Sequence, residues 1–413
     1  MEYVLEKATR QHTRDHNSRL VLRKIYDAGE ISRATLARLT RLTRTTISEV
    51  VADLIEQGLV QEVGQGPAGV GRTPTLLSVV DDARLIVAVD ITHHEIQGAL
   101  VNLRGAIRRQ ARLPLPGQDG TTALTLLFPL LDSLIKAAGS PLLGIGISSP
   151  GLIDTASGTV RRAVNFDWLD LPLRAMVQER YHLPVYVAND GHLVALAEYM
   201  FGQSRNSARL VTIKVGRGIG AGIMLNGQLL SSETFGAGEI GHVVVERDGP
   251  RCNCGNRGCL EALANVSAIA DRARVIARQH PDSLLHQFAA VSEAITIDAI
   301  AQAGQAGDLI ARQLIVDVGR YLAIAVANLI AVLGARRVVV TGRIAPFGQM
   351  LRTAIEEEIR QLILPDLAEA TEIEVLAQRP DTILLGAAAL LLTNELGLAR
   401  LVRRQPHDEA IAA

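Results

Sequence analysis

The 413-residue chain has few aromatic residues, few cysteines and almost no net charge. Aromatic residues make up 3% of the sequence and hydrophobic residues 48%, so Ala, Val, Ile and Leu must form the cores, which suits layered α/β folds better than a β-sandwich. The net charge of −1 excludes neither nucleic acid nor small molecules as ligands. A signal-peptide core is absent from the N-terminal segment, and the apolar runs near 321–335 and 383–392 are too short or interrupted for a membrane span. We therefore expect a cytoplasmic protein without a membrane partner.

The three cysteines, Cys252, Cys254 and Cys259, all lie within eight positions. An odd, clustered set is a poor framework for disulfides, and free thiols fit a reducing compartment. With His242, ten residues upstream, they form a Cys₃His set that suits a closed, structural zinc site with no position for a catalytic water. The alternative is three buried cysteines that are neighbours by chance.

Residues 1–79 are expected to form a DNA-binding head. Between 10 and 48 there are nine basic and three acidic side chains, a balance that suits a phosphate backbone. Hydrophobic periodicity and capping residues predict three helices followed by a hairpin. The first helix covers about 16–28, the second begins after Ser32, and the third runs from Thr43 to Gln57. The hairpin consists of strands at 59–63 and 75–79. This order of elements is that of a winged helix-turn-helix.

The third predicted helix carries the candidate base-reading residues, because recognition helices read bases near their N-terminus. They are Arg44, Thr45, Thr46 and Ser48. A guanidinium can bind guanine, and Arg72, in the tip between the two strands, could enter a minor groove. The alternative is a helical interaction module with a solvated basic face.

From residue 80 onward, one pattern occurs twice: a strand followed by two hairpins, over about 85–112 and 210–231. Later α/β elements follow each copy. This predicts the duplicated, two-lobed α/β architecture of the actin-like, ribonuclease-H-like sugar kinases, with lobes at 80–200 and 201–400, a ligand between them and a disordered tail at 403–413. The glycine turn 216–222 matches a dinucleotide fingerprint, but a strand follows it, so no helix N-terminus can receive a pyrophosphate. A P-loop is absent too.

Polar residues follow the buried strand at 185–188. Asn189 and Asp190 together suit the vicinal hydroxyls of a ligand, and Asp190 could also take a proton from a substrate hydroxyl. The alternative is a turn that caps the following helix. Glu239 and Glu261 stand on either side of the cysteine cluster, which favours a binding site.

These motifs together resemble those of the ROK family, which comprises bacterial repressors and sugar kinases. The likeness covers essentially the whole chain, and its most specific motifs are Gly238-Glu-Ile-Gly-His242 and Cys252-x-Cys-Gly-x-x-Gly-Cys-Leu-Glu261. It implies that His242 and the three cysteines hold zinc. It also implies that five residues contact a sugar: Asn189, Asp190, Glu239, His242 and Glu261.

The chain departs from the kinases of that family at their glycine-rich phosphate turns. Residues 90–95 are Asp-Ile-Thr-His-His-Glu, where those kinases carry Asp-x-Gly-Gly-Thr. Arg217 stands where they have threonine, and the stretch 341–343 is altered as well. These changes imply that nucleotide binding is lost while sugar binding is kept. His93 and His94 are expected in an exposed turn and not in a metal pair.

We therefore expect a transcriptional regulator, most simply a repressor of carbohydrate uptake or catabolism genes, similar to the branch that responds to xylose, glucose or N-acetylglucosamine. Its partners would be operator DNA, a sugar acting as inducer or co-repressor, and further copies of the chain in a homodimer or larger homo-oligomer. One alternative is an ATP-dependent sugar kinase that retains the head, with Asp190 as general base. Others are control by a protein partner, or zinc as the sensed signal, although closed Cys₃His sites are normally structural.

Overall fold

The computed structural model describes residues 10–65, 73–116, 119–205, 207–231, 236–289 and 291–398. They form two compact units: one contains the chain up to Ala188 together with the stretch from Ala387, and the other contains Asn189–Gly386. The chain thus passes between the units twice, the second time inside helix α14 (Thr382–Asn394). The tail at 403–413 and the wing-tip residue Arg72 lie outside the described residues.

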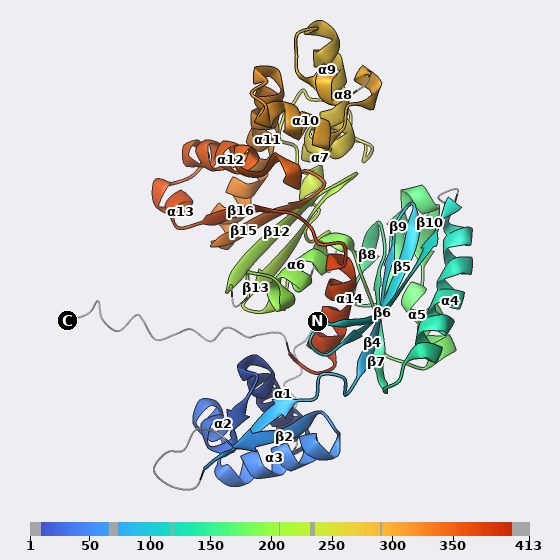
Figure 1. Ribbon diagram of the computed structural model, residues 1–413, viewed down its shortest axis with the longest axis vertical. Helices are drawn as coiled ribbons and strands as arrows, with labels where there is room; N and C mark the ends of the chain where they lie inside the picture. The colour runs from blue at the N-terminus through green and yellow to red at the C-terminus, as the bar shows by residue number, and fades with distance from the viewer. Residues whose placement is uncertain are drawn as a thin grey trace, which may run out of the picture. The chain divides into compact units, whose positions relative to one another are not determined.

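The head, drawn in blue in Figure 1, has the predicted order of elements. Its sheet has the strand order β1-β3-β2. Both predicted helix caps are confirmed: Ser32 Oγ accepts from the N–H of Thr35 at 3.2 Å, and Thr43 Oγ1 from that of Thr46 at 3.1 Å. The elements are α1 (Arg10–Ala28), β1 (Ile31–Ser32), α2 (Arg33–Thr40), α3 (Arg44–Glu56), β2 (Val60–Gln65) and β3 (Thr75–Val79).

Helix α1 begins at Arg10, earlier than the expected start near residue 16. Its first turns are polar and exposed, so hydrophobic periodicity gives no signal there. This polar part of α1 contacts α3 through an ion pair in which Arg14 Nη2 lies 2.7 Å from Asp53 Oδ2. The core of the head is formed by fully buried aliphatic side chains, including those of Ile25, Leu36 and Ile47.

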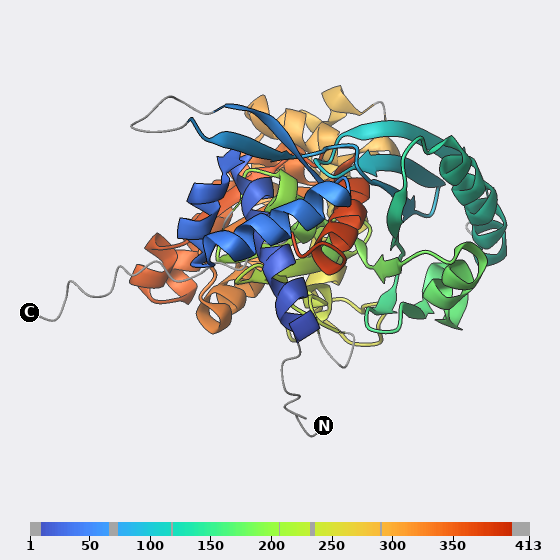
Figure 2. The ribbon, with the colours of Figure 1, turned by 90° about the horizontal axis from the view of Figure 1, so that it is seen from below.

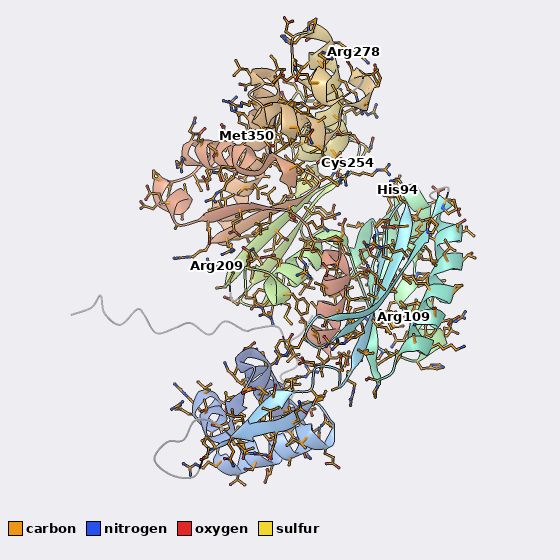
Figure 3. All side chains as sticks on the ribbon, viewed as in Figure 1. His94, Arg109, Arg209, Cys254, Arg278 and Met350 are labelled. Carbon is orange, nitrogen blue, oxygen red and sulfur yellow. The ribbon has the colours of Figure 1, made fainter. Side chains whose placement is uncertain are left out.

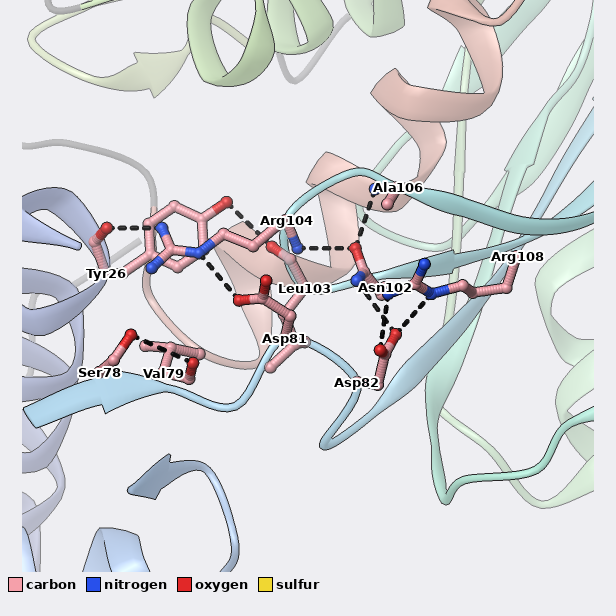
Figure 4. Close-up of polar contacts among 10 residues, drawn as sticks. All are labelled: Tyr26, Ser78, Val79, Asp81, Asp82, Asn102, Leu103, Arg104, Ala106 and Arg108. Atoms are coloured by element: carbon pink, nitrogen blue, oxygen red, sulfur yellow. Dashed lines mark hydrogen bonds and ion pairs between the residues drawn. The ribbon is translucent and has the colours of Figure 1, made fainter. Parts of the chain in front are cut away.

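Helix α1 also contacts the turn after β5 (Glu95–Asn102) in the same unit (Figure 4). The Tyr26 hydroxyl donates to the carbonyl of Leu103 at 2.9 Å. Arg104 donates to the Tyr26 carbonyl at 2.6 Å and, from Nε, to Asp81 Oδ1 at 3.2 Å. Polar contacts thus fix the last turn of α1 against the α/β part of the first unit.

The first unit contains a five-stranded sheet of order β11-β7-β4-β5-β6 and a small sheet of order β10-β9-β8. Helix α4 (Gly120–Ala137) contacts β4, β5 and β6 and lies along one face of the large sheet (Figures 1 and 2). The other elements are β4 (Leu85–Ile91), β6 (Ile107–Pro114), β7 (Leu142–Ser148), β8 (Leu152–Asp154), β9 (Thr159–Ala163), β10 (Trp168–Leu171), α5 (Leu173–Tyr181) and β11 (Val185–Ala188).

The second unit repeats this architecture with a five-stranded sheet of order β14-β13-β12-β15-β16. In each large sheet an antiparallel meander carries two further parallel strands, so the predicted duplication is confirmed. The strands are β12 (Arg209–Val215), β13 (Ile219–Leu225), β14 (Gln228–Leu229), β15 (Arg337–Gly342) and β16 (Glu372–Leu376). The helices are α6 (Asp190–Phe201), α7 (Leu260–Ala264), α8 (Val266–Gln279), α9 (Leu285–Phe288), α10 (Ile297–Gln305), α11 (Leu309–Leu333), α12 (Gly348–Leu362) and α13 (Pro365–Glu369).

One boundary of the second unit differs from expectation. A lobe boundary at residue 200 would leave α6 with the first lobe, whereas α6 contacts β12 and β13. Further along the chain, the segment 271–300 is divided among α8, the short α9 and the start of α10. Pro281 follows the end of α8, and a proline cannot continue a helix's hydrogen-bond ladder.

Helix α11 is the one described helix that by length and composition could cross a membrane, with 50% of its apolar window buried inside the structure. The helix begins at Leu309, twelve residues before the apolar run near 321–335 seen in the sequence. Its inward side belongs to the core of the second unit, where Leu314, Val318 and Leu322 are buried. A buried core helix passes the same test, so this one helix is weak evidence for a membrane span.

Candidate functional site

The predicted metal ligands converge. The ligand atoms of His242, Cys252, Cys254 and Cys259 all lie within 4.8 Å of one another. His242 Nδ1 is 3.7 Å from the sulfur of Cys252, and the sulfurs of Cys254 and Cys259 are also 3.7 Å apart. In a tetrahedral zinc site the ligand atoms are separated by about 3.5–3.8 Å, so these four residues fit a zinc ion in both chemistry and spacing.

The chain reverses tightly around this cluster. Two isolated β-bridges, Val244 with Cys259 and Arg251 with Arg257, bring its two sides together. Gly258 has φ +70°, and a Cβ there would lie 1.5 Å from the carbonyl oxygen of Glu246, so no other residue fits without rearrangement. The glycine that the sequence places among the cysteines is therefore a geometric requirement of the fold.

Two of the three thiols resist ionisation on their own. Burial raises the pKa of Cys252, and it raises that of Cys259 to about 12. Without a positive charge nearby, these thiols stay protonated at neutral pH. A zinc ion that binds here must displace those protons, which couples metal affinity to pH.

The second ring nitrogen of His242 faces a carboxylate. His242 Nε2 lies 3.9 Å from Glu239 Oε2. A metal bound at Nδ1 would thus leave Nε2 available on the side of Glu239, so the cluster can fix the orientation of the imidazole that borders the acidic residues. Glu239 is itself half-buried, and burial, together with the nearby charges of Glu261 and Asp190, raises its pKa despite the opposing effect of His242.

Glu261, on the other side of the cysteines, is held by the backbone of the β12–β13 turn. Its Oε2 accepts a hydrogen bond of 2.9 Å from the N–H of Ile219. A Cβ on Gly218 would lie 2.9 Å from the same oxygen. The bare glycine therefore leaves room for the carboxylate of Glu261 beside the turn.

Asn189 and Asp190 lie at the start of α6, directly after strand β11, as the sequence predicted. Asn189 Oδ1 accepts from the N–H of His192 at 2.9 Å, which confirms the helix-capping alternative for Asn189 and leaves its amide nitrogen to be used elsewhere. Asp190 forms an ion pair with Lys214 on β12. Partial desolvation acts to raise the pKa of the half-exposed Asp190, but Lys214 and the backbone N–H of Gly191 outweigh it and the net pKa is lowered.

The five predicted sugar contacts thus all belong to the second unit, and the charges of Glu261 and Asp190 both act to raise the pKa of Glu239. Sequence reasoning missed Lys214. A lysine inside the apolar strand Leu-Val-Thr-Ile-Lys-Val is a usable signal, because charged side chains rarely enter buried strands without a partner. It also missed His192, which is buried and whose Nε2 lies 3.0 Å from the carbonyl oxygen of Ala237.

A side chain closes the turn that was expected to differ from the kinase motif. The Thr92 hydroxyl closes the turn at 92–95 by donating to the carbonyl of Glu95 at 2.9 Å. His94 is exposed, as expected, and is labelled in Figure 3. His93 is not: its ring stacks on Phe166 with 5.2 Å between centroids. The exposed position expected for His93 was wrong because Phe166, from a distant segment, covers its ring.

In the head, Arg44, Thr45 and Ser48 are exposed at the start of α3. Thr46 is half-buried, and its hydroxyl lies 2.9 Å from that of Thr43 in the helix cap, so it is less available to a base than expected. Arg38 and Arg41 are exposed next to this end of α3. Other basic residues of the head are engaged within it, since Arg33 pairs with Glu62 at 2.8 Å.

A family model described as "ROK family" matches residues 86–394. The chain belongs to the ROK family.

Among its curated relatives, the "Xylose repressor" of Caldicellulosiruptor bescii is 33% identical over 92% of this chain and 96% of its own length. The "DNA-binding transcriptional repressor Mlc" of Escherichia coli is 30% identical over 87% of this chain and 88% of its own. A crystal structure of a ROK family transcriptional regulator, described as a homologue of the E. coli protein MLC, is similar to this ROK protein with a TM-score of 0.83, 28% identity and coverage of 94% and 98%.

A ROK family glucokinase from Streptomyces griseus, solved in complex with glucose and AMPPNP, is also similar, with a TM-score of 0.64 and 27% identity. It covers 74% of this chain while 98% of its own length is matched. The repressor-type relatives therefore match nearly the whole of this ROK protein, and the kinase matches about three quarters of it.

Proposed function

We propose that this ROK protein is a DNA-binding transcriptional repressor of carbohydrate uptake or catabolism genes, acting in the cytoplasm, whose affinity for its operator is controlled by a sugar bound in the second unit. The observation that carries this proposal is the combination, in one chain, of the winged head with Asn189, Asp190, Glu239, His242 and Glu261 in the second unit. Relatives named as repressors match the chain across both parts.

The head would bind DNA through the start of α3. Arg44 and Thr45 are exposed at that helix end, where recognition helices read bases. Arg38 and Arg41 lie beside them and would contact phosphates. A homodimer or larger assembly would present two heads to an operator with two half-sites, because in dimeric helix-turn-helix proteins each head contacts one half-site.

The second unit would bind the sugar through carboxylates that accept hydrogen bonds from hydroxyl groups. Asp190, Glu239 and Glu261 supply these acceptors, and His242 would add a ring nitrogen at Nε2. The zinc ion would act structurally: held by His242 Nδ1 and the three cysteines, it would supply a fixed positive centre that keeps His242 oriented.

The charges at this site favour a free sugar over its phosphate ester. Three carboxylates converge there, and the ammonium of Lys214 is paired with one of them, that of Asp190. A phosphate dianion placed among these groups would be repelled. We therefore propose a neutral sugar as the effector.

The second candidate function is an ATP-dependent sugar kinase, favoured by the similarity to the glucokinase and by the place of Asp190. Against it, His93, His94 and Glu95 occupy the turn where kinases of the family have glycines. Bulky side chains there oppose the close approach of backbone to phosphates on which such turns depend.

Thermal stabilisation of the purified protein by a panel of sugars tests the proposal. We expect stabilisation by one of xylose, glucose or N-acetylglucosamine, none by the corresponding phosphate esters and none by ATP, because a ligand that binds only the folded state raises the melting temperature. The stabilising sugar should then change the affinity for operator DNA. Sugar-dependent release of ADP from ATP would instead establish the kinase.

A further inference from the structure

Lys214 is the one charged side chain in β12 between residues 210 and 215. The residues on either side of it, Ile213 and Val215, are fully buried, while the lysine side chain is 23% exposed. An ammonium group in such a place loses much of its hydration, and this cost is offset only by a close partner of opposite charge. That partner is the carboxylate of Asp190 at the start of α6.

The surroundings leave space for this pair. Lys214 stands opposite Gly220 in the antiparallel register of β12 and β13, and a Cβ on Gly220 would meet no atom within 4 Å. A Cβ on Gly216 would lie 3.9 Å from Lys214 Nζ. Gly216 thus borders the lysine ammonium, the space above Gly220 is open, and the Asp190 side chain remains 49% exposed. The carboxylate is accessible to a ligand while its counter-ion lies deeper.

The charged and titratable groups around Asp190 shift its pKa in opposite directions. Lys214 on β12 favours its ionised form, and Glu239, from the segment before the cysteine cluster, opposes it. His192, two residues further along α6, is buried, and burial lowers the pKa of its ring, so at neutral pH it carries no charge to help. Lys214 is therefore the main group that holds Asp190 ionised, with a smaller contribution from the backbone N–H of Gly191.

The consequence is chemical. A carboxylate held by an ammonium group is a good acceptor for hydroxyl hydrogen bonds, because the ion pair fixes its charge and orientation. The same pairing makes it a weaker base, since a proton taken from a substrate would have to compete with the lysine. Such a carboxylate suits recognition of a hydroxyl better than proton abstraction.

We propose that Lys214 is a positioning residue of the sugar site, which fixes the Asp190 carboxylate as a permanent hydrogen-bond acceptor for a sugar hydroxyl. This inference rests on the proposed function of the second unit. It assigns a role to a residue outside the five predicted contacts.

Calorimetric titration of the full-length protein with xylose, glucose and N-acetylglucosamine, at pH 5 and pH 8, tests this proposal. The variants are Lys214→Met, which keeps the length of the side chain without its charge, and Lys214→Arg, which keeps the charge. We expect the methionine variant to bind the sugar about tenfold more weakly at pH 8 and to lose further affinity at pH 5, because Asp190 without its partner takes up a proton. The arginine variant should retain most of the affinity and the wild-type pH profile.

Glu239 and the residues of the cysteine cluster are unchanged in all three proteins, so the difference between each variant and the wild type isolates Asp190. Thermal melts check folding, and Lys214→Gln replaces the methionine variant if that protein does not fold. Equal affinity and equal pH dependence in the neutral variant and the wild type would overturn the inference. So would an affinity loss that does not change with pH and that arginine fails to rescue. Absence of binding by the wild type to any sugar would overturn the proposed function itself, and the inference with it.

Discussion

The guanidinium of Arg104 lies over the ring of Tyr26, 4.2 Å from the ring centroid, and donates a hydrogen bond of 2.6 Å to the Tyr26 carbonyl (Figure 4). That carbonyl belongs to the last turn of α1, where helix carbonyls lack partners and a cation is stabilising. The two residues come from the DNA-binding head and from the turn between β5 and β6. They form a polar connection between the head and the α/β part of the first unit.

Replacing Arg104 with Ala should weaken this connection by about 1 kcal/mol, the typical worth of a partly exposed cation–π contact. We expect DNA affinity without sugar to change little. The sugar-induced change in DNA affinity should shrink, because the head is held less firmly to the α/β part of the first unit. Fluorescence anisotropy with labelled operator, with and without the sugar, measures both. Arg109→Ala is the matched control, since Arg109 is exposed on β6 (Figure 3). An unchanged sugar response in Arg104→Ala would exclude this contact from signal transmission.

A second prediction concerns base recognition by Arg44. Its replacement by Ala should cost about 1–3 kcal/mol in operator binding and relax the base preference at one position. Selection of bound sequences from a random DNA pool, followed by affinity measurement, tests both effects. Arg33→Ala serves as control because Arg33 is paired with Glu62. Equal losses in the two variants would mean that Arg44 supplies charge only.

Much of this architecture could be predicted from local sequence signals. The caps at Ser32 and Thr43 and the strands from Leu85 and Leu210 depend on residues close together in the chain. The position of His93 depended on Phe166, more than seventy residues away, and local periodicity contains no information on such contacts. The ion pair of Asp190 with Lys214 could not be predicted for the same reason, although the lysine in an apolar strand was visible.

The third prediction uses two neighbouring glycines of the β12–β13 turn. A Cβ on Gly218 would lie 2.9 Å from Glu261 Oε2, whereas a Cβ on Gly220 would meet no atom within 4 Å. The end of a flexible glutamate can move, so Gly218→Ala should displace the Glu261 carboxylate at little cost in stability. We expect sugar affinity to fall several-fold in Gly218→Ala and to stay near wild type in Gly220→Ala. Calorimetric titration and thermal melts distinguish this from unfolding; equal affinity in both variants would separate Glu261 from the sugar.

The fourth prediction concerns the metal. Purified protein should contain one equivalent of zinc per chain, and Cys254→Ser should lower that content because one of four ligands is lost. Cys254 is the exposed thiol of the cluster, so this substitution disturbs the core least. We expect loss of the sugar response with retention of DNA binding, since His242 would lose its fixed orientation. Elemental analysis gives the metal content, and a full sugar response in a zinc-free protein would show that the metal does not support the site.

The final prediction concerns the stability of the second unit, through the buried side chain of Asp308. Its carboxylate caps α11 by accepting from the N–H groups of Ile310 and Ala311 at 2.8 and 3.0 Å, and it accepts from the Ser283 hydroxyl at 2.6 Å. Burial acts to raise the pKa of Asp308, but these hydrogen bonds outweigh it and the net pKa is lowered. The stabilisation is therefore present above the unfolded-state value near 3.8 and is lost as the pH falls through the lower folded-state pKa.

Asp308→Ala should lower the free energy of unfolding at pH 7 by about 2–3 kcal/mol, from the lost cap and the unpaired Ser283. Asp308→Asn, which keeps one acceptor oxygen, should lose less. Urea unfolding at pH 7 and at pH 3 measures the difference, which should shrink at the lower pH because the unfolded-state carboxylate takes up a proton below about 3.8. Asp298→Ala is the control, because Asp298 is exposed in the first turn of α10. A loss in Asp308→Ala that stayed constant with pH would mean that packing, and not the charge on Asp308, secures the start of α11.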